Sequence, residues 1–411
     1  MTPAACRFCG APPELSFADL GMSPPSNSYL EAGALNRMER FYPLHAWVCG
    51  KCFLVQLEEF ETPEQIFSDY AYFSSYSESW LAHAKAYTQA MTARFGLNAA
   101  SFVVEIASND GYLLQYFMAQ GVPVLGIEPA ANVAAVAQKK GVPTLVKFFG
   151  TKTAGELAAA GRKADLVLGN NVLAHVPDLN DFVRGMALLL KPGGVVTMEF
   201  PHLLKLMQEN QFDTIYHEHF SYLSFVVAER VFAAHGLTLF DVDEIPTHGG
   251  SLRVYARHTA NAALPVSTKV AELRVREQAA GLERADTYCA FAEQVRSTKR
   301  SLLKFLIGAK ESGKRVAGYG APAKGNTLLN YCGVRMDLLE YTVDRSPHKQ
   351  GRFLPGVHIP IHAPERIMQD KPDYVLILPW NLKEEIVAQM AGIRAWGGRF
   401  VVPIPETKVL D

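Results

Sequence analysis

An α/β protein with two doubly wound domains behind a small cysteine-rich module is predicted from three observations. Strand, turn and helix patterns alternate in residues 102–200, the alternation returns in residues 314–402, and four cysteines near the N-terminus form two Cys-x-x-Cys pairs. The 411 residues are too many for one ordinary core. We therefore expect domains at residues 1–62, 63–260 and 261–411.

The cysteine pairs indicate a metal module. Cys6, Cys9, Cys49 and Cys52 could present four thiolates tetrahedrally to one zinc ion, and a small zinc-stapled module can hold the insertion between the pairs. Two disulfides or a redox-active pair are the alternatives. The lack of a basic and apolar leader disfavours disulfides, and a redox site would need only one pair.

Composition and charge are those of a globular protein. Forty basic and 41 acidic side chains leave a net charge of -1, so no overall electrostatic attraction to nucleic acid or to an anionic membrane is expected. No uninterrupted apolar stretch reaches about 18 residues, and no leader is recognisable. We expect a cytoplasmic protein, and both monomer and dimer stay open.

The first α/β stretch is read element by element. Strands are expected at 102–106, 124–128, 143–147, 164–168 and 195–200, with helices at 112–119, 133–140, 152–160 and 179–190. The run Lys191-Pro192-Gly193-Gly194 ends the last of these helices, because proline and glycine cannot extend it. One more helix and two closing strands, at 239–244 and 251–257, complete this half.

The flanking segments have their own patterns. Aromatic and hydroxyl side chains crowd residues 64–79, before a helix at 80–95, and such a segment can cover a site. Residues 270–310 predict a helical connector. The second α/β stretch has expected strands at 315–318, 339–343, 374–378 and 399–402, with helices at 325–331 and 382–390.

The loop after the first strand, residues 105–111, lies where nucleotide-binding α/β domains approach their ligand. Only Gly111 remains of the glycines that remove side-chain obstruction there, which disfavours a pyrophosphate but suits a methionine moiety. Glu128 ends the next strand, where a carboxylate can accept both ribose hydroxyls, although acidic residues also end strands as solvent-facing caps. Asn170 and Asn171 end a later strand.

The order of this loop, Glu128, residues 165–168 and residues 190–194 resembles that of class I S-adenosylmethionine-dependent methyltransferases. The resemblance implies that S-adenosylmethionine is the cofactor. The implied cofactor contacts are Glu105, Ala107, Asn109, Gly111, Tyr112, Leu113, Glu128, Pro129, Asn170 and Asn171.

The densest group of proton-transfer side chains is Tyr216-His217-Glu218-His219-Phe220-Ser221-Tyr222. Imidazole titrates near neutral pH and a neighbouring carboxylate can hold one tautomer, so the run indicates a general-base cluster. A polar strand edge and a metal site are the alternatives. A His-x-His pair can ligate zinc, but no cysteine, aspartate or further histidine at ligand spacing completes such a site.

As a whole the chain resembles the nucleotide-sugar C-methyltransferases of deoxysugar pathways, which include 3-C-methyltransferases acting on dTDP-4-keto sugars. The resemblance covers nearly all of the chain and rests on the cysteine pairs and on residues 105–114, 216–222 and 318–326. It implies a zinc module, a methyltransferase domain and a C-terminal Rossmann-like domain, with the sugar between the last two. It favours dTDP over GDP as the nucleotide.

The chemistry of that family fits the residues. A carbon beside a ketone is acidic enough to give an enolate, which can attack the methyl group of the cofactor, so a base and an enolate stabiliser are required. We assign His219 as the base, because it matches the family's Tyr-His-Glu-His motif. His217 and Glu218 would orient it or bind sugar hydroxyls.

Hydrogen-bond donors to the developing oxyanion are expected among the tyrosines. Tyr216, Tyr222 and one tyrosine of residues 64–79 are the candidates, with Tyr70 preferred to Tyr72 and Tyr76. His175 would lie at the mouth of the same site. Tyr72 and Tyr76 are also expected to contact the sugar.

The C-terminal loop at residues 318–326 has neither a complete GxGxxG motif nor Walker spacing. Lys324 and the amides at the helix start could hold the substrate diphosphate, although a plain strand-to-helix turn is the alternative. Tyr319 could stack on the base, and Asn326 could contact phosphate or sugar. Arg345 ends the next strand, where ribose contacts are common.

Three other functions stay open from sequence. An O- or N-methyltransferase would not need acidic C–H chemistry. A binding protein could have kept the cofactor fold and lost activity. A dehydrogenase would use the C-terminal half to hold a nicotinamide cofactor.

Overall fold

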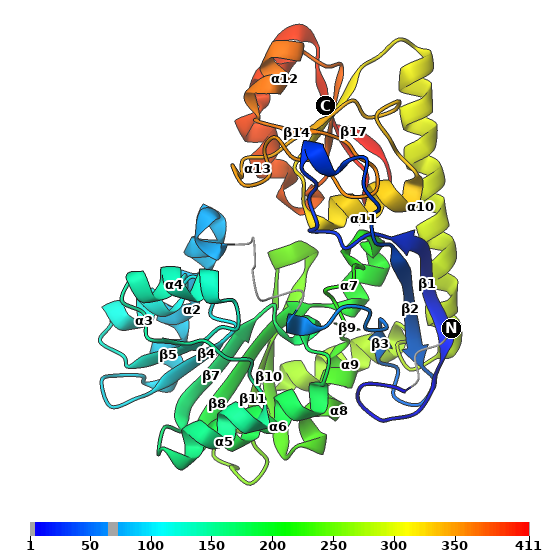
Figure 1. Cartoon of the computed structure of the whole chain (residues 1–411). Coiled ribbons are helices and arrows are strands. Elements are labelled where there is room, and N and C mark those ends of the chain that lie inside the picture. The colour runs from blue at the N-terminus through cyan, green and yellow to red at the C-terminus, as the bar shows by residue number, and fades with distance from the viewer. Residues whose placement is uncertain (1–4, 65–72, 411) are drawn as a thin grey trace.

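The computed structural model describes residues 5–64 and 73–410, and its described strands form three sheets. Figure 1 shows the seven-stranded sheet in the lower lobe, the six-stranded sheet in the upper lobe and a four-stranded module beside both. The helix α10 (Ala285–Glu311) runs along one side and joins the lobes. The predicted α/β architecture with a cysteine-rich module is confirmed.

The seven-stranded sheet has the order β10-β11-β8-β7-β4-β5-β6. Its strands are β4 (Val103–Ile106), β5 (Val124–Ile127), β6 (Thr144–Leu145), β7 (Ala164–Asn170), β8 (Leu190–Pro201), β10 (Leu237–Ile245) and β11 (Ser251–His258). Strands β4 to β8 pair in parallel, and β11 pairs antiparallel with β8. All seven lie within a few residues of the predicted strands.

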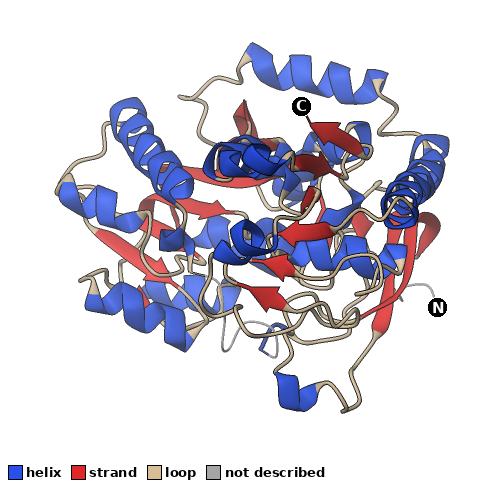
Figure 2. Cartoon of the chain, turned by 90° about the horizontal axis from the view of Figure 1, so that it is seen from above, coloured by secondary structure: helices blue, strands red, loops and turns tan. Residues whose placement is uncertain are grey.

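Helices cover both faces of this sheet, as Figure 2 shows from above. They are α2 (Glu78–Phe95), α3 (Leu114–Ala119), α4 (Ala131–Lys139), α5 (Thr151–Ala159), α6 (Leu179–Leu189) and α8 (Phe225–Ala234), whereas α7 (Leu203–Gln208) packs in the core shared by the N-terminal module and the C-terminal domain. Alternate residues of β4 enter different cores, Val104 and Ile106 on one side and Val103 on the other. This alternation is why helices pack on both sides.

The start of β8 differs from the prediction. Helix α6 ends at Leu189 as expected, but Lys191-Pro192-Gly193-Gly194 belongs to the strand, which begins at Leu190. Leu190 pairs with Ala164 of β7, and a Cβ at Gly194 would stand 2.9 Å from the Ala164 carbonyl oxygen. The glycine is needed because the two strands approach closely there.

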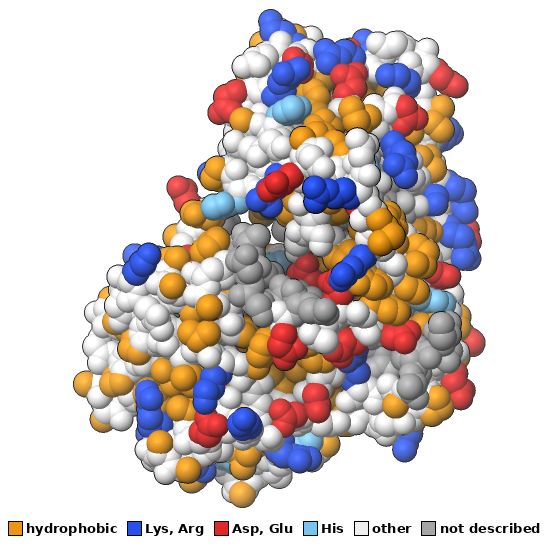
Figure 3. Space-filling model, viewed as in Figure 1, with side chains coloured by type: hydrophobic (Ala, Val, Ile, Leu, Met, Phe, Trp, Pro, Cys, Tyr) orange, Lys and Arg blue, Asp and Glu red, His pale blue; other side chains and the backbone are white. Residues whose placement is uncertain are grey.

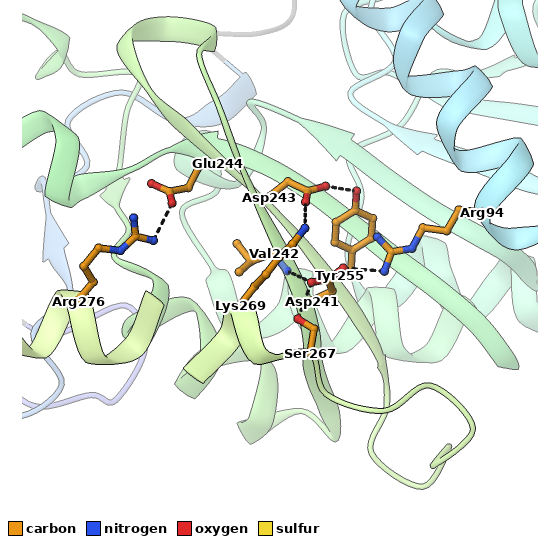
Figure 4. Close-up of polar contacts among 9 residues, drawn as sticks. All are labelled: Arg94, Asp241, Val242, Asp243, Glu244, Tyr255, Ser267, Lys269 and Arg276. Carbon is orange, nitrogen blue, oxygen red and sulfur yellow. Dashed lines mark hydrogen bonds and ion pairs between the residues drawn. The ribbon is translucent and has the colours of Figure 1, made fainter. Parts of the chain in front are cut away.

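Polar contacts fasten the outer hairpin of this sheet to α2 and to α9 (Thr268–Ala279), as Figure 4 shows. Arg94 of α2 pairs with Asp241 (2.7 Å), which also accepts a hydrogen bond from Ser267 (2.6 Å). Lys269 of α9 pairs with Asp243 (2.7 Å), and that carboxylate also accepts from the Tyr255 hydroxyl. The Arg94 contact holds α2 against the sheet, and the Lys269 contact does the same for α9.

The N-terminal module contains a sheet of order β1-β2-β3-β9. Its strands are β1 (Pro13–Ser23), β2 (Tyr42–Cys49), β3 (Val55–Gln56) and β9 (Ser221–Tyr222). The sequence did not predict β1 and β2, because three register irregularities interrupt their alternation of apolar and polar residues. The last strand, β9, comes from residues 216–222, which we call the histidine-rich run and which lie more than 160 residues away in the chain.

The four cysteines of the module converge. Their Sγ atoms all lie within 4.8 Å of one another, and the Cys6–Cys52 and Cys9–Cys49 Sγ pairs are 3.5 Å apart. Both Cys-x-x-Cys pairs sit on matching turns, because Gly10 N–H donates to the Cys6 carbonyl and Phe53 N–H to the Cys49 carbonyl. Four thiolates at this spacing fit one tetrahedral zinc ion, whose Zn–S bonds are about 2.3 Å.

The upper lobe is the second α/β domain, with strand order β14-β13-β12-β15-β16-β17. Its elements are β12 (Val316–Tyr319), α11 (Ala323–Cys332), β13 (Thr342–Val343), β14 (Ile361–His362), α12 (Glu365–Asp370), β15 (Tyr374–Ile377), α13 (Lys383–Gln389), β16 (Arg399–Val402) and β17 (Lys408–Leu410). Phe291 of α10 stacks on Phe17 of β1 at 4.5 Å between ring centroids, which ties the connector to the N-terminal module.

The surface agrees with the near-neutral net charge. Figure 3 shows lysine and arginine side chains interspersed with aspartate and glutamate on the face it draws. Among the described residues, no helix combines the length and the apolar character needed to cross a membrane.

Cys49→Ser is expected to release the metal and to lower the Tm by several degrees, because zinc closes the turns that hold β2 and β3 together. Metal content by plasma mass spectrometry and Tm by scanning calorimetry check this. The control is Cys289→Ser, which changes an exposed cysteine outside the cluster. Loss of the metal with an unchanged Tm would contradict a structural role.

Candidate active site

The histidine-rich run lies where the three parts of the molecule meet. Four hydrogen bonds hold the run and the residues on either side of it: Phe220 N–H to Ala174 O (2.7 Å), Leu57 N–H to Phe220 O (3.0 Å), Leu203 N–H to Leu223 O (3.0 Å) and Thr327 Oγ1–H to Ile215 O (3.1 Å). These partners come from the domain of the seven-stranded sheet, the N-terminal module, α7 and α11. The backbone of the run is therefore fixed from several directions.

A cavity of about 50 Å³ lies beside the run. Apolar side chains such as Phe200 and Leu206 form much of its wall. The polar side chains that line it are Thr214, Tyr216, His219, Ser221, Tyr222, His248 and Lys324. Both α/β domains contribute, since Lys324 belongs to α11.

His219 is held as a neutral imidazole. Its Nδ1 lies 2.9 Å from the Thr214 carbonyl oxygen, which can only accept, so Nδ1 carries the hydrogen and Nε2 carries the lone pair. Burial, aided by the charge of Lys324, holds the pKa of His219 well below its usual range. The side chain is therefore ready to accept a proton at neutral pH.

Aromatic rings and a second histidine surround His219. Its ring centroid lies 3.9 Å from that of Tyr216 and 4.7 Å from that of His175. His175 Nδ1 donates to the Glu218 carbonyl oxygen (2.8 Å), and burial lowers the pKa of His175 to about 4. Burial also raises the pKa of the Tyr222 phenol well above its usual range, so this hydroxyl keeps its hydrogen.

The side chains of His217 and Glu218 leave the cavity. Residues 216–219 form a turn, closed by the His219 N–H bond to the Tyr216 carbonyl (2.9 Å), so consecutive side chains diverge. His217 packs edge-on against Tyr42 of the N-terminal module, and its Nε2 lies 3.3 Å from the Pro43 carbonyl oxygen. The sequence predicts that His217 orients His219 or binds sugar hydroxyls, but among the described residues no contact between the two histidine side chains is present.

Glu218 faces the N-terminal module instead. Asn27 Nδ2 donates to its carboxylate at 2.6 Å. Burial raises the pKa of Glu218 to about 7, and the bond from Asn27 opposes the shift in part. Glu218 orients His175 through its backbone carbonyl, whereas its side chain links the run to Asn27 of the N-terminal module.

Lys324 enters the cavity from the C-terminal domain. Its Nζ donates to Asn381 Oδ1 (2.7 Å) and lies 4.5 Å from the Trp380 ring centroid. The Trp380 indole N–H donates to Asp213 Oδ2 (2.8 Å). Asp213 directly precedes Thr214, the residue whose carbonyl oxygen orients His219. The sequence had suggested a diphosphate contact for Lys324, but the structure brings the ammonium group to the same cavity as His219.

Sequence reasoning missed His248. It stands in the left-handed region (φ 57°) in the turn η5 (Thr247–Gly249), and Asn171 Nδ2 lies 3.4 Å from its Nδ1. A Cβ at Gly249 would stand 2.6 Å from the Trp380 ring, so the glycine allows the two domains to meet at this turn. The Gly249-Gly250 pair after a lone histidine was the available signal.

The predicted cofactor loop is tightly wound. Ala107 (φ 56°), Asn109 (φ 48°) and Gly111 (φ 77°) all adopt left-handed conformations, so two non-glycine residues accept strain of about 1 kcal/mol each. Glu128 holds the loop, because its carboxylate accepts from the amides of Asn109 (2.9 Å) and Ala130 (2.8 Å). This bonding explains how the loop forms with few glycines.

Polar groups converge on this loop. Glu105 is completely buried, which raises its carboxyl pKa well above the usual range, and Tyr112 and Leu113 are buried beside it. Both amide atoms of Asn170 are buried and, within the described part of the chain, have no hydrogen-bond partner. Buried polar atoms of this kind require a polar ligand, as the amino acid and ribose groups of S-adenosylmethionine would provide.

The other predicted substrate residues lie apart from the cavity. Tyr319 is buried and donates to Gln389 (3.1 Å), and Asn326 is fully buried within α11. Arg345 is exposed and pairs with Glu385 (3.4 Å). Tyr76 is 65% exposed, with its ring centroid 6.3 Å from that of His348.

Two predicted residues, Tyr70 and Tyr72, lie outside the described residues. Pro129 follows Glu128 and precedes Ala130, whose amide binds the Glu128 carboxylate. The described residues thus bring together His219, Tyr216, Tyr222 and His175 at one end of the site, and the loop with Glu128 and Asn170 at the other.

Comparison with known proteins gives matches along the whole chain. A zinc binding domain matches residues 6–67, a methyltransferase domain residues 80–242 and a C-methyltransferase C-terminal domain residues 246–405. The C-methyltransferase NovU of Streptomyces niveus is 37% identical over 410 residues, which are 99% of this chain and 96% of that protein. This chain belongs to the same family of C-methyltransferases.

This C-methyltransferase therefore depends on S-adenosylmethionine and carries a zinc-binding module. Partial matches also exist. The ubiquinone biosynthesis O-methyltransferase of Methylobacterium nodulans is 34% identical over 97 residues, 23% of this chain and 38% of that protein. The magnesium protoporphyrin IX methyltransferase of Synechocystis aligns at a TM-score of 0.33 and 16% identity, over 43% of this chain and 78% of that one.

Glu128→Gln is expected to weaken cofactor binding at least about 10-fold. A glutamine side chain has only one acceptor oxygen, so it cannot accept hydrogen bonds from two backbone amides and from two ribose hydroxyls at once. Calorimetric titration with S-adenosylhomocysteine measures the effect. Glu156→Gln, an exposed residue that pairs with Lys147, serves as the control. Unchanged affinity in Glu128→Gln would remove this carboxylate from the cofactor site.

Proposed function

We propose that this C-methyltransferase methylates C-3 of a nucleotide-linked 4-keto-deoxysugar, with His219 as the general base. The observation that carries the proposal is the neutral His219, whose Nδ1 is bound to the Thr214 carbonyl and whose Nε2 is left to accept a proton beside the cavity. A C-methyltransferase must remove a proton from carbon, and a base held neutral by burial suits that step.

The proposed reaction begins with proton removal. His219 Nε2 takes the proton from the carbon beside the ketone, the C–H electron pair becomes a C=C bond, and the carbonyl pair moves to oxygen. The cofactor supplies an electrophilic methyl group on sulfur. The enolate carbon attacks this methyl group, the S–CH₃ electron pair stays on sulfur, and the ketone re-forms.

The nucleotide is proposed to bind at the C-terminal domain, with dTDP favoured over GDP by family resemblance. Strand β12 lies between β13 and β15, so the chain direction of the connections reverses there and leaves a crevice at the carboxyl ends of the strands. The Ala321 amide and Lys349 both contact Asp344 at this edge (2.7 and 3.7 Å). Such a crevice is a common nucleotide position.

In deuterated water the wild-type enzyme is expected to exchange the keto-adjacent hydrogen of dTDP-4-keto-deoxysugars and to add one methyl group to that carbon. His219→Asn should reduce both rates at least about 100-fold while the affinity for S-adenosylhomocysteine is kept. Mass spectrometry and carbon NMR read the outcomes. Methylation at oxygen or nitrogen, or near-normal exchange by His219→Asn, would contradict the proposal.

A pH profile provides a separate check. Because burial lowers the pKa of His219 well below its usual range, the free base persists as the pH falls, and the rate is lost only when the pH passes through the lowered value. The acid limb of kcat/KM should therefore have its midpoint well below the ordinary histidine pKa of about 6.5. A midpoint at the ordinary histidine value, in an enzyme that circular dichroism shows to be folded, would contradict a buried neutral base.

A further inference from the structure

Lys324 occupies an unusual place for a residue of the C-terminal domain. It is the second residue of α11, yet it lines the same cavity as Tyr216 and His219 of the methyltransferase domain. It reaches the cavity because α11 is anchored to the histidine-rich run by the bond from Thr327 to the Ile215 carbonyl. The helix thus delivers its first turn to the reaction site.

The contacts of Lys324 hold the ammonium group without neutralising it. Asn381 accepts one hydrogen bond, and the Trp380 ring lies below the charge. No carboxylate of the described residues comes within 4.0 Å of Lys324 Nζ. An ammonium group has three donors, so contacts remain for a substrate oxygen.

The other described residues that line the cavity carry no positive charge. Burial keeps His175 and His248 neutral, with pKa values lowered to about 4, and His219 neutral as well. Burial also lowers the pKa of Lys324 to about 8, while the charge of Asp213 opposes that shift, so the ammonium form still dominates at neutral pH. Lys324 is the cation of this cavity among the described lining residues.

An enolate needs such a cation. Proton removal from carbon places a full negative charge on the ketone oxygen, inside a small cavity with apolar walls such as Phe200. In such surroundings an unbalanced anion is costly, and a fixed positive group is worth more than it would be in water. The phenols of Tyr216 and Tyr222 can donate hydrogen bonds but carry no charge.

We propose that the Lys324 ammonium group binds the ketone oxygen and stabilises the enolate, so that the C-terminal domain supplies a catalytic group. The inference rests on the proposed function. The ammonium donates a hydrogen bond to the oxygen and keeps its proton. His219 takes the proton, the C–H electron pair forms the C=C bond, and the carbonyl pair rests on the oxygen until the carbon attacks the methyl group.

A diphosphate contact explains the position less well. A diphosphate carries at least two negative charges, and burying it in this cavity beside one cation would leave charge uncompensated. A ketone oxygen needs only one partner, and it lies on the same sugar ring as the acidic carbon that His219 must reach.

Lys324→Met tests the role. With a dTDP-4-keto-deoxysugar that the wild type methylates, the variant should lose at least about 100-fold in kcat and in the rate of hydrogen exchange in deuterated water, with KM within about 3-fold. Lys324→Arg, which keeps the charge, should retain more of both rates. Lys383→Met, an exposed lysine of the same domain, is the control.

The outcomes separate the two proposals. If the wild type neither exchanges nor methylates any 4-keto sugar, the proposed function fails before Lys324 is tested. If the wild type does both, a raised KM with unchanged kcat and exchange in Lys324→Met would assign Lys324 to substrate binding and overturn the inference. Unchanged values of all three would overturn it too. Titration with S-adenosylhomocysteine verifies folding, and Asn381→Ala, expected to lose about 10-fold in exchange, supplies a second variant.

Discussion

The pairing of β9 with β3 is the contact on which the site depends. Two residues of the histidine-rich run complete a sheet whose other strands belong to the zinc-stapled module. Together with a hydrogen bond donated to the Ala174 carbonyl and bonds accepted from Leu203 and Thr327, this pairing fixes a segment that has no regular structure between residues 215 and 220. The zinc module thereby stabilises the position of His219, although the metal site itself lies outside the cavity.

The proposed reaction gives the second α/β domain a role in the site. The methyltransferase domain surrounds the cavity with neutral imidazoles and protonated phenols, which suits proton removal but offers the ketone oxygen no cationic hydrogen-bond donor. The C-terminal domain brings Lys324, and the contact of Trp380 with Asp213 and Gly249 holds the two domains together at that place. The proposed base and the proposed cation thus come from different domains, so the proposed site is complete only when the domains are packed together.

Much of the fold followed from hydrophobic period and turn residues, because strands such as β4 and helices such as α6 are long or strongly patterned. The short strands β9 and β14 have no such signal, and β1 and β2 are irregular. Sequence spacing alone revealed the four cysteines of the metal cluster, and in the site it revealed Glu128 and the run at residues 216–222. The divergence of His217 from His219 was not apparent from spacing, since it arises from one tight turn. Nor was the contact of Trp380 with Lys324 and with the turn that carries His248, because it forms only through the packing of two domains.

A structure of the enzyme with S-adenosylhomocysteine and a dTDP-4-keto-deoxysugar would test the assignment of base and cation most directly. The ketone oxygen should lie about 3 Å from Lys324 Nζ, with the carbon beside it facing His219 Nε2 and the cofactor sulfur on the opposite side. A sugar whose diphosphate contacts Lys324, or whose ketone points away from both residues, would contradict it.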